Sequence, residues 1–339
     1  MTSNQKLWLS LGCLGWLAVC LLGLGGLWLL AGPPRPNRPA NPPLVFPTRS
    51  SEPAQTPGAL ALALSPTPAP APVVTGKIVY VCQVFKRQAQ DQICLINADG
   101  TGQRRLTTTD TARHFYPSFA PDGKSVLFSA NLDGNFKIYE QKLTGELQKL
   151  GETVGIAPEV SPDNRWVAFT QSDGQKDFIW IMARDGSAPR LLVAGWDPTW
   201  APDASRILFA TLVNGQPQLA SVNLDGSDWR AITDLPDLRG RSDWSPDGSL
   251  IVTYAGKPWQ RELFLLNADG SGLRQLTQPG GNSQGPSFSP DGRQVAFTAY
   301  FDAHQNQNGC EIYRLSLDGS DLTRLTNNDY CDWQPRWGP

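Results

Sequence analysis

One short motif of this sequence has the form of a catalytic site. The segment GNSQG at 281–285 matches the Gly-x-Ser-x-Gly elbow that presents a nucleophilic serine in α/β-hydrolases. That elbow requires a strand before the serine and a helix after it. Ser283 instead lies between two repeated motifs, in a segment that we expect to be a loop. We therefore interpret Ser283 as a loop residue and predict no catalytic residue there.

The two histidines, His114 and His304, are the other candidates for acid–base or metal chemistry. A histidine base needs a neighbouring nucleophile, and a metal needs several ligands, but neither histidine has such a motif neighbour. We interpret both as solvated loop residues and expect no metal or other cofactor. The competing hypothesis is a hydrolase or lyase acting on a polysaccharide or peptide, with the two histidines close together and a carboxylate between them.

A group of aspartates belongs to a repeated motif, which reads FSPDGRQVAF at 288–297. Proline presets φ at the first corner of a turn, aspartate can accept a hydrogen bond from a nearby amide, and glycine tolerates positive φ. Equivalent carboxylates spread over successive repeats cannot form one site. We therefore predict that these aspartates are turn formers; they are Asp122, Asp163, Asp203, Asp247 and Asp291.

The repeat that contains these turns also predicts the fold. Two further landmarks, typified by LNADGS at 266–271 and QLT at 275–277, recur in step with the prolines. Within the last full unit, apolar residues recur at every second position, which predicts strands around 286–288, 294–299 and 312–317. A fourth strand would end at the Leu-Thr landmark. Units of roughly 40–45 residues with four strands, repeated radially, form a β-propeller.

Closure of the ring follows from the two ends of the repeat region. The final PRWGP supplies only a first strand, whereas GKIVYVC at 76–82 supplies a second strand with no first. Strands at 94–97 and 104–107 would complete that unit. We therefore predict an all-β, six-bladed β-propeller over residues 76–339, with a composite closing blade in which Trp337 lies beside Ile78.

Four cysteines lie at this seam, at spacings that suit pairing better than a zinc site. Cys82 and Cys94 could pair across a hairpin, and Cys310 and Cys331 lie in loops on one face. Two disulfides would restrain the ends of the unfolded chain. The alternative is that the four are free buried thiols.

The segment before the propeller predicts attachment to a membrane. Residues 7–32 carry no charge and, as a helix, would exceed the ~30 Å of bilayer hydrocarbon. We interpret residues 1–32 as an uncleaved signal-anchor, and the Pro/Ala/Ser/Thr-rich residues 33–75 as a disordered, semi-rigid linker. Flanking arginines favour a cytoplasmic domain, whereas the cysteines favour an extracytoplasmic one. We favour a membrane-anchored, periplasmic or cell-surface propeller.

The charge balance bears on the partner. The chain has a net charge of −2, and the first 75 residues are basic, so the predicted propeller is more acidic than the whole. Nucleic-acid binding requires a basic face. We therefore expect no nucleic-acid partner.

The three landmarks resemble the repeat of the TolB-like six-bladed propeller family, whose signature is P-x-W-S-P-D-G-x-x-I-x-F, then I-Y-x-x-N-x-D-G-S, then R-L-T. The resemblance covers residues 76–339 and implies the propeller fold; it is specific for fold and poor for function. The propeller that gates prolyl oligopeptidase-type hydrolases is related to it. No segment of this sequence resembles the catalytic domain of those hydrolases, so the resemblance implies no catalytic residue.

The residues just before each P-x-W/F step should ring one mouth of the central channel. Their aromatic and charged variety suits recognition of a protein, peptide or carbohydrate. The alternative is that the tryptophans among them pack between blades. We predict a tethered propeller that binds a partner and catalyses nothing. The candidate residues are His114, Phe115, Tyr116, Ile156, Trp196, Asp197, Arg239, Arg241, Gln284, Asp332 and Trp333, with Trp259 from a neighbouring loop.

Overall fold

The computed structural model describes residues 74–83, 90–109, 111–301 and 309–339. The predicted anchor, nearly all of the predicted linker and His304 lie outside these ranges. Within them, no helix has the length and apolar character needed to cross a membrane. Residues 72–339 form one compact unit.

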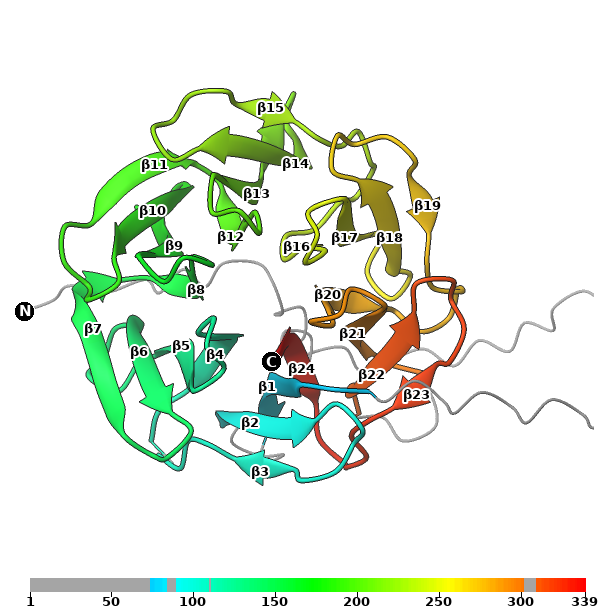
Figure 1. Cartoon of the computed structure of the whole chain (residues 1–339), viewed down its shortest axis with the longest axis horizontal. Coiled ribbons are helices and arrows are strands. Elements are labelled where there is room, and N and C mark those ends of the chain that lie inside the picture. The colour runs from blue at the N-terminus through cyan, green and yellow to red at the C-terminus, as the bar shows by residue number, and fades with distance from the viewer. Residues whose placement is uncertain (1–73, 84–89, 110, 302–308) are drawn as a thin grey trace, which may run out of the picture. The chain divides into compact units, whose positions relative to one another are not determined.

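The described residues form six four-stranded antiparallel sheets around a central axis (Figure 1). We number these sheets as blades 1 to 6 and give their strands from the innermost outwards. Blade 1 contains β24 (Asp332–Gly338), β1 (Lys77–Gln83), β2 (Asp91–Asn97) and β3 (Arg104–Arg105). Blade 2 contains β4 (His114–Phe119), β5 (Ser125–Ala130), β6 (Lys137–Lys142) and β7 (Leu147–Val154). Blade 3 contains β8 (Ile156–Val160), β9 (Trp166–Ser172), β10 (Asp177–Ala183) and β11 (Arg190–Ala194).

The other three blades repeat this order. Blade 4 contains β12 (Trp196–Trp200), β13 (Arg206–Val213), β14 (Gln216–Asn223) and β15 (Arg230–Ala231). Blade 5 contains β16 (Asp243–Trp244), β17 (Leu250–Ala255), β18 (Glu262–Asn267) and β19 (Arg274–Gln275). Blade 6 contains β20 (Gln284–Phe288), β21 (Gln294–Ala299), β22 (Glu311–Ser316) and β23 (Thr323–Arg324).

The ring closes as the sequence predicts. β24 pairs with β1, and Ile78 stands opposite Trp337 in that ladder. The all-β, six-bladed propeller with a composite closing blade is therefore confirmed. Several strand boundaries differ from the prediction by one or two residues, and the largest difference is at β2, which begins at Asp91, so Cys94 lies within the strand instead of at its start.

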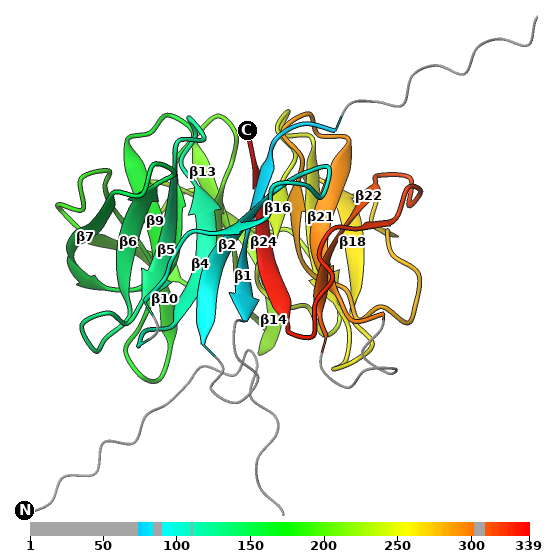
Figure 2. The same ribbon diagram turned by 90° about the horizontal axis from the view of Figure 1, so that it is seen from below.

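The two faces of the ring differ in what they carry. The side-on view in Figure 2 places the end of β24 on the upper face, which we call the turn face because the Pro-Asp-Gly turns follow the inner strands there. The opposite face, where the inner strands begin, is called the loop face. Apolar side chains fill the space between adjacent blades; between blades 5 and 6 they include Val252, Leu265 and Phe297.

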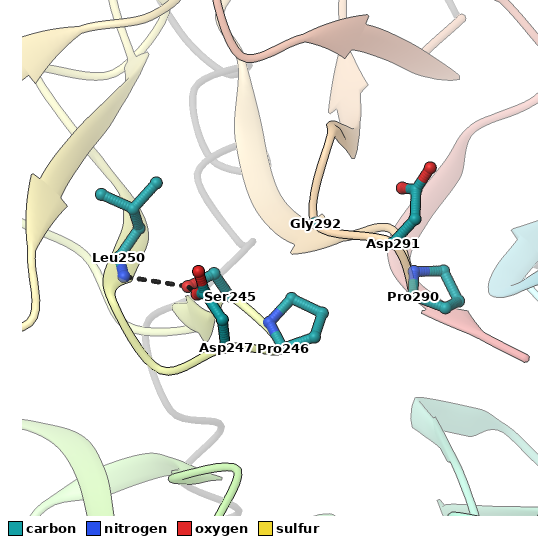
Figure 3. A pocket seen from close by; sticks show the side chains of 7 residues that line it. All are labelled: Ser245, Pro246, Asp247, Leu250, Pro290, Asp291 and Gly292. Carbon is teal, nitrogen blue, oxygen red and sulfur yellow. Dashed lines mark hydrogen bonds between the residues drawn. The ribbon is translucent and has the colours of Figure 1, made fainter. Parts of the chain in front are cut away.

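The repeated aspartates are turn formers, as predicted. In each of the five turns the aspartate Oδ1 accepts a hydrogen bond from the backbone N–H two residues later, over 2.9 to 3.1 Å. In blade 5, Ser245 donates to Asp247 and also accepts the N–H of Leu250 at 2.9 Å (Figure 3). The turns of blades 5 and 6 lie close together. A Cβ atom added at Gly292 would lie only 3.3 Å from the ring of Pro246, so the glycine allows this approach.

In four of the six blades, the Leu-Thr or Ile-Thr landmark joins the end of the outer strand to the third strand. In blade 5, Thr277 Oγ1 accepts the N–H of Leu263 at 2.9 Å and donates to Glu262. The same pair of bonds is made by the equivalent threonines of blades 1, 4 and 6, which are Thr107, Thr233 and Thr326. The landmarks are therefore scaffold, and specific chemistry must come from residues that vary among the repeats.

Both predicted disulfides are present, and the alternative of four free thiols is wrong. Cys82 bonds to Cys94 across the β1–β2 hairpin, with 5.8 Å between the Cα atoms. Cys310 bonds to Cys331, with 4.4 Å between the Cα atoms, and so links blade 6 to the segment that enters β24. Each bridge lies beside the closing blade.

Removing the second disulfide should measurably weaken the ring. We expect the double variant Cys310→Ser/Cys331→Ser to lose about 3 kcal/mol of unfolding free energy, because the unfolded chain regains the freedom that the cross-link removes. Urea unfolding of the oxidised proteins measures this loss. Under reducing conditions the two proteins should unfold at the same urea concentration, and a persistent difference would assign the effect to the serine side chains.

Candidate binding site at the central channel

The inner strands build the channel wall in three layers. In five of the six inner ladders the register shifts at a β-bulge. At this point each blade has a residue with φ between +27° and +59°, which is followed by proline in five blades and by Ser242 in blade 5. A bulge adds one residue and re-aims the side chains after it. The bulge residues are Tyr116, Ala157, Asp197, Arg241, Gly285 and Gln334.

The residues on either side of the bulge form the other two layers. Before it, nearest the loop face, lies a mouth layer of Phe115, Ile156, Trp196, Gly240, Gln284 and Trp333. Two residues after each bulge residue lies a deep layer of Ser118, Glu159, Thr199, Asp243, Ser287 and Arg336. The deep residue is the variable x of the P-x-W/F step, which reads P-E-V in blade 3 and S-D-W in blade 5.

Arg336 makes contacts with more blades than any other side chain described in the deep layer, and we call it the hub of that layer for this reason. Its Nε donates to Glu159 Oε1 at 2.7 Å, and its Nη2 lies against the same oxygen. Its guanidinium also donates to the carbonyls of Ser242 at 3.3 Å and Pro286 at 3.4 Å, and lies 3.8 Å from Asp243. One side chain of blade 1 therefore connects blades 3, 5 and 6 across the channel.

The deep carboxylates are held by polar neighbours yet remain in reach of solvent. Asp243 Oδ2 accepts from Ser287 Oγ and from the N–H of Phe288, both at 2.9 Å. Thr199 donates to Glu159 at 3.3 Å. The side chains of Glu159 and Asp243 are 15% and 20% exposed. Burial raises the pKa of Glu159, and the charge of Arg336 opposes this rise.

Arg241 dominates the bulge layer. Its backbone N–H donates to Asp197 Oδ2 at 3.0 Å, and its Nη2 reaches across the channel to the carbonyl of Pro117 in blade 2, also at 3.0 Å. Its guanidinium lies 5.7 Å from the ring centre of Tyr116. Burial, followed by the charge of Arg336, lowers the pKa of Arg241 to about 10. Burial also raises the pKa of Asp197.

The mouth layer is aromatic. Phe115 and Trp333 meet edge to face with ring centres 5.5 Å apart. Trp196 and Trp333 are half-buried against the apolar clusters between blades, so part of each ring packs there and part remains at the mouth. Trp259, from the loop before β18, is 57% exposed and rests on Tyr300 at 5.4 Å.

Three predicted mouth residues occupy a different position. His114, Arg239 and Asp332 each lie two residues before the bulge, one step outside the mouth layer. His114 is buried in β4, with Nδ1 3.1 Å from the carbonyl oxygen of Asp91, and burial lowers its pKa. The interpretation of His114 as a solvated loop residue is therefore wrong. Asp332 is also buried and accepts a hydrogen bond from Asn328, so it does not face the mouth.

The errors about which residues face the channel mouth have one physical reason. Successive side chains of a strand point to opposite sides, so an error of one residue moves a side chain from the channel into the blade. The deep layer was missed for the same reason. The signal that could have revealed Glu159, Asp243 and Arg336 was the variation of the residue between a position that is proline in five of the six blades and a mostly aromatic position.

The remaining candidates show no catalytic arrangement in the described ranges. Ser283 lies in the loop before β20, so a strand follows it where the hydrolase elbow would need a helix. Among the described side chains, no three of the His, Cys, Asp and Glu type are grouped so that they could hold a metal.

Comparison with known proteins gives a family match along the propeller. The family model described as TolB beta propeller domain matches residues 65–235 and 197–339. Over 141 residues the chain is 28% identical to the Tol-Pal system protein TolB of Bordetella pertussis, which covers 40% of this chain and 32% of that protein. An uncharacterized protein of Agrobacterium fabrum is 27% identical over 117 residues, which covers 32% of this chain and 40% of that protein. The matched part is thus well under half the length of these relatives.

Solved structures share the fold. TolB from Acinetobacter baumannii superposes with a TM-score of 0.69 at 21% identity, over 78% of this chain and 67% of that chain. A putative TolB from Agrobacterium tumefaciens superposes with a TM-score of 0.59 at 18% identity, over 78% of this chain and 99% of that chain.

Proposed function

Because this chain belongs to the TolB beta propeller domain family, we propose that it is a binding protein that holds a partner at the loop-face mouth of its channel and catalyses no reaction. One observation carries the proposal. The residues that repeat make turns and strand contacts, whereas the residues that vary gather around the channel. Aromatic rings such as Trp196 and Trp333 surround its mouth, and charged groups such as Arg241 and Asp197 lie beneath them. Aromatic residues and arginine are the types that dominate binding hot spots.

A protein or peptide is the partner that we favour over a glycan. The Bordetella relative is named as a component of a Tol-Pal system, which supports a protein partner for this chain as well. The channel mouth offers charged groups and flat apolar surface together, a combination that suits an inserted peptide segment.

We also propose that the propeller works outside the cytoplasm. Two disulfides support this location, because such bonds persist in oxidising compartments. In this proposal residues 1–32 anchor the chain in the membrane, residues 33–75 act as a linker, and residues 76–339 form the binding domain.

Truncating the mouth tryptophans tests the binding function. In capture experiments with the full-length chain and extracts of its own cells, we expect Trp196→Ala and Trp333→Ala each to reduce recovery of the partner at least tenfold, since both remove apolar contact area at the mouth. Trp229→Ala, which removes an exposed tryptophan far from the channel, is the matched control and should leave recovery unchanged. Undiminished capture by both mouth variants, with melting temperatures close to wild type, would contradict the proposal.

A further inference from the structure

The two arginines of the channel differ in how well they are paired. Arg336 has a carboxylate partner and two carbonyl partners. Arg241 is 6% exposed, and its guanidinium donates a hydrogen bond to the neutral carbonyl of Pro117. Its Nε is buried without a hydrogen-bond partner. Within the described part of the chain, no carboxylate oxygen lies within the 4.0 Å of an ion pair with this guanidinium.

A buried guanidinium in this condition is costly to the free protein. An ion removed from water is tolerated when an opposite charge and good hydrogen bonds replace its hydration. Here burial and the neighbouring charge of Arg336 disfavour the cation, which nevertheless stays protonated at neutral pH. The charges of Glu159 and Asp197 favour the cation without a direct ion pair to it, and an anion brought by a ligand would supply that direct pair.

The surroundings of Arg241 include two small wall residues and one more suitable donor. The bulge residues of blades 3 and 6 are Ala157 and Gly285, so two of the six wall positions carry almost no side chain. Gln334 uses its Oε1 to accept the N–H of Tyr116 at 2.8 Å. What its amide can still offer a ligand is therefore the NH₂ group, a donor.

The charge of the neighbouring groups selects a small monoanion. Asp197, Glu159 and Asp243 surround the arginines, and a dianion such as phosphate would be repelled more strongly by them. Glu159 and Asp243 are already engaged at the deep layer, and Asp197 receives the backbone N–H of Arg241. A planar carboxylate matches the two parallel N–H donors of a guanidinium.

We propose that Arg241 binds a carboxylate of the partner that enters through the loop-face mouth, with Gln334 donating a further hydrogen bond and the mouth aromatics contacting the adjacent residues. This inference rests on the proposed function and names the chemistry that the mouth recognises. The carboxylate can come from an Asp or Glu side chain or from the C-terminus of a peptide, and both sources share the same recognition.

Three peptides of equal length test the inference on the full-length chain by fluorescence anisotropy. The first is acetyl-Phe-Gly-Glu-Gly-amide, the second is acetyl-Phe-Gly-Gly-Gly with a free C-terminus, and the third is the neutral acetyl-Phe-Gly-Gln-Gly-amide, each labelled on the phenylalanine ring. We expect at least one of the acidic peptides to bind tenfold or more tightly than the neutral one. The acidic peptide that binds identifies the source of the carboxylate.

Variants of Arg241 then assign the effect to its guanidinium. Arg241→Met should reduce the preference for the acidic peptide to less than twofold. Arg241→Lys keeps the positive charge but loses the pair of parallel N–H donors, so it should retain part of the preference. Arg239→Met is the matched control, since this arginine stands one step outside the mouth layer, and it should keep the full preference. Melting temperatures verify that each variant is folded.

The inference is wrong if the three peptides bind equally, if none binds, or if Arg241→Met keeps the preference. Partner capture separates this failure from failure of the proposed function. If Arg241→Met still captures the natural partner while Trp196→Ala and Trp333→Ala do not, the mouth binds without carboxylate recognition, and the broader proposal stands.

Discussion

Replacing Arg336 by methionine is expected to destabilise the propeller by about 3–5 kcal/mol, because it leaves a buried carboxylate without its counter-charge. Arg336 is 7% exposed and bonds to Glu159 and to the carbonyls of Ser242 and Pro286. Its loss would leave acceptors of three other blades unsatisfied at once. Urea unfolding at neutral pH measures the change in free energy.

A double variant separates the charge from the packing. In Arg336→Met/Glu159→Gln both ionised groups are removed, so we expect part of the lost stability to return. Arg230→Met is the matched control, because the Arg230–Asp228 pair lies at the surface, with the Arg230 side chain 61% exposed, and should contribute little to stability. A loss below 1 kcal/mol for Arg336→Met, or a double variant less stable than the single one, would contradict the account of Arg336 as the hub.

Replacing Asp332 by asparagine is expected to stabilise the propeller at neutral and alkaline pH. Asp332 is 1% exposed; its Oδ2 accepts from Asn328 at 2.8 Å, and its Oδ1 has no partner. The buried carboxylate of Glu311 acts on it electrostatically, and Arg324 pairs with Glu311 at 2.7 Å. Burial, followed by the charge of Glu311, raises the pKa of Asp332 from 3.8 to about 7.

The sign of the pH dependence follows from this shift. The folded protein holds the proton of Asp332 more tightly than the unfolded chain does, so the contribution of this group is most favourable below pH 3.8. That contribution is lost as pH rises towards 7 and stays lost above it. At about 1.4 kcal/mol for each pKa unit, the rise from 3.8 to about 7 corresponds to a loss on the order of 4 kcal/mol. An asparagine does not titrate and avoids the loss.

Unfolding free energies of wild type and Asp332→Asn between pH 5 and pH 8 provide the test. Their difference should grow in favour of the variant as pH rises to about 7 and then level off. Asp99→Asn, which changes an exposed turn aspartate whose pKa is lowered by Thr101, should show no such gain at high pH. A variant that is less stable than wild type at pH 8 would show that the ionised carboxylate is needed.

The scaffold could be predicted from the sequence because each repeated landmark makes a local contact. The Pro-Asp-Gly turns bond within a few residues, and the Leu-Thr step bonds to the neighbouring strand. Even the non-local pairing of Trp337 with Ile78 followed from counting strands at the two ends of the repeat. The cysteine pairs followed from the same count.

The channel could be predicted only in part. A bulge shifts by one residue the alternation of side chains between the two sides of a strand. The bulge residues here are of six different types, so no residue type predicts their position. The sequence therefore identified Tyr116, Asp197 and Arg241 as channel residues but placed His114 and Asp332 beside them. The contact of Arg336 with Glu159 joins blades that are far apart in the chain, so no local pattern contains it.

The composite blade also sets the order of events during biosynthesis. β1 to β3 emerge first from the ribosome, yet their innermost neighbour, β24, is synthesised after every other strand. Until then β1 presents an open edge, and the arginine that spans the channel is not yet made. The nascent chain therefore cannot close the ring of blades during elongation, and a newly made copy depends on late docking of β24 before Cys331 can form its disulfide with Cys310.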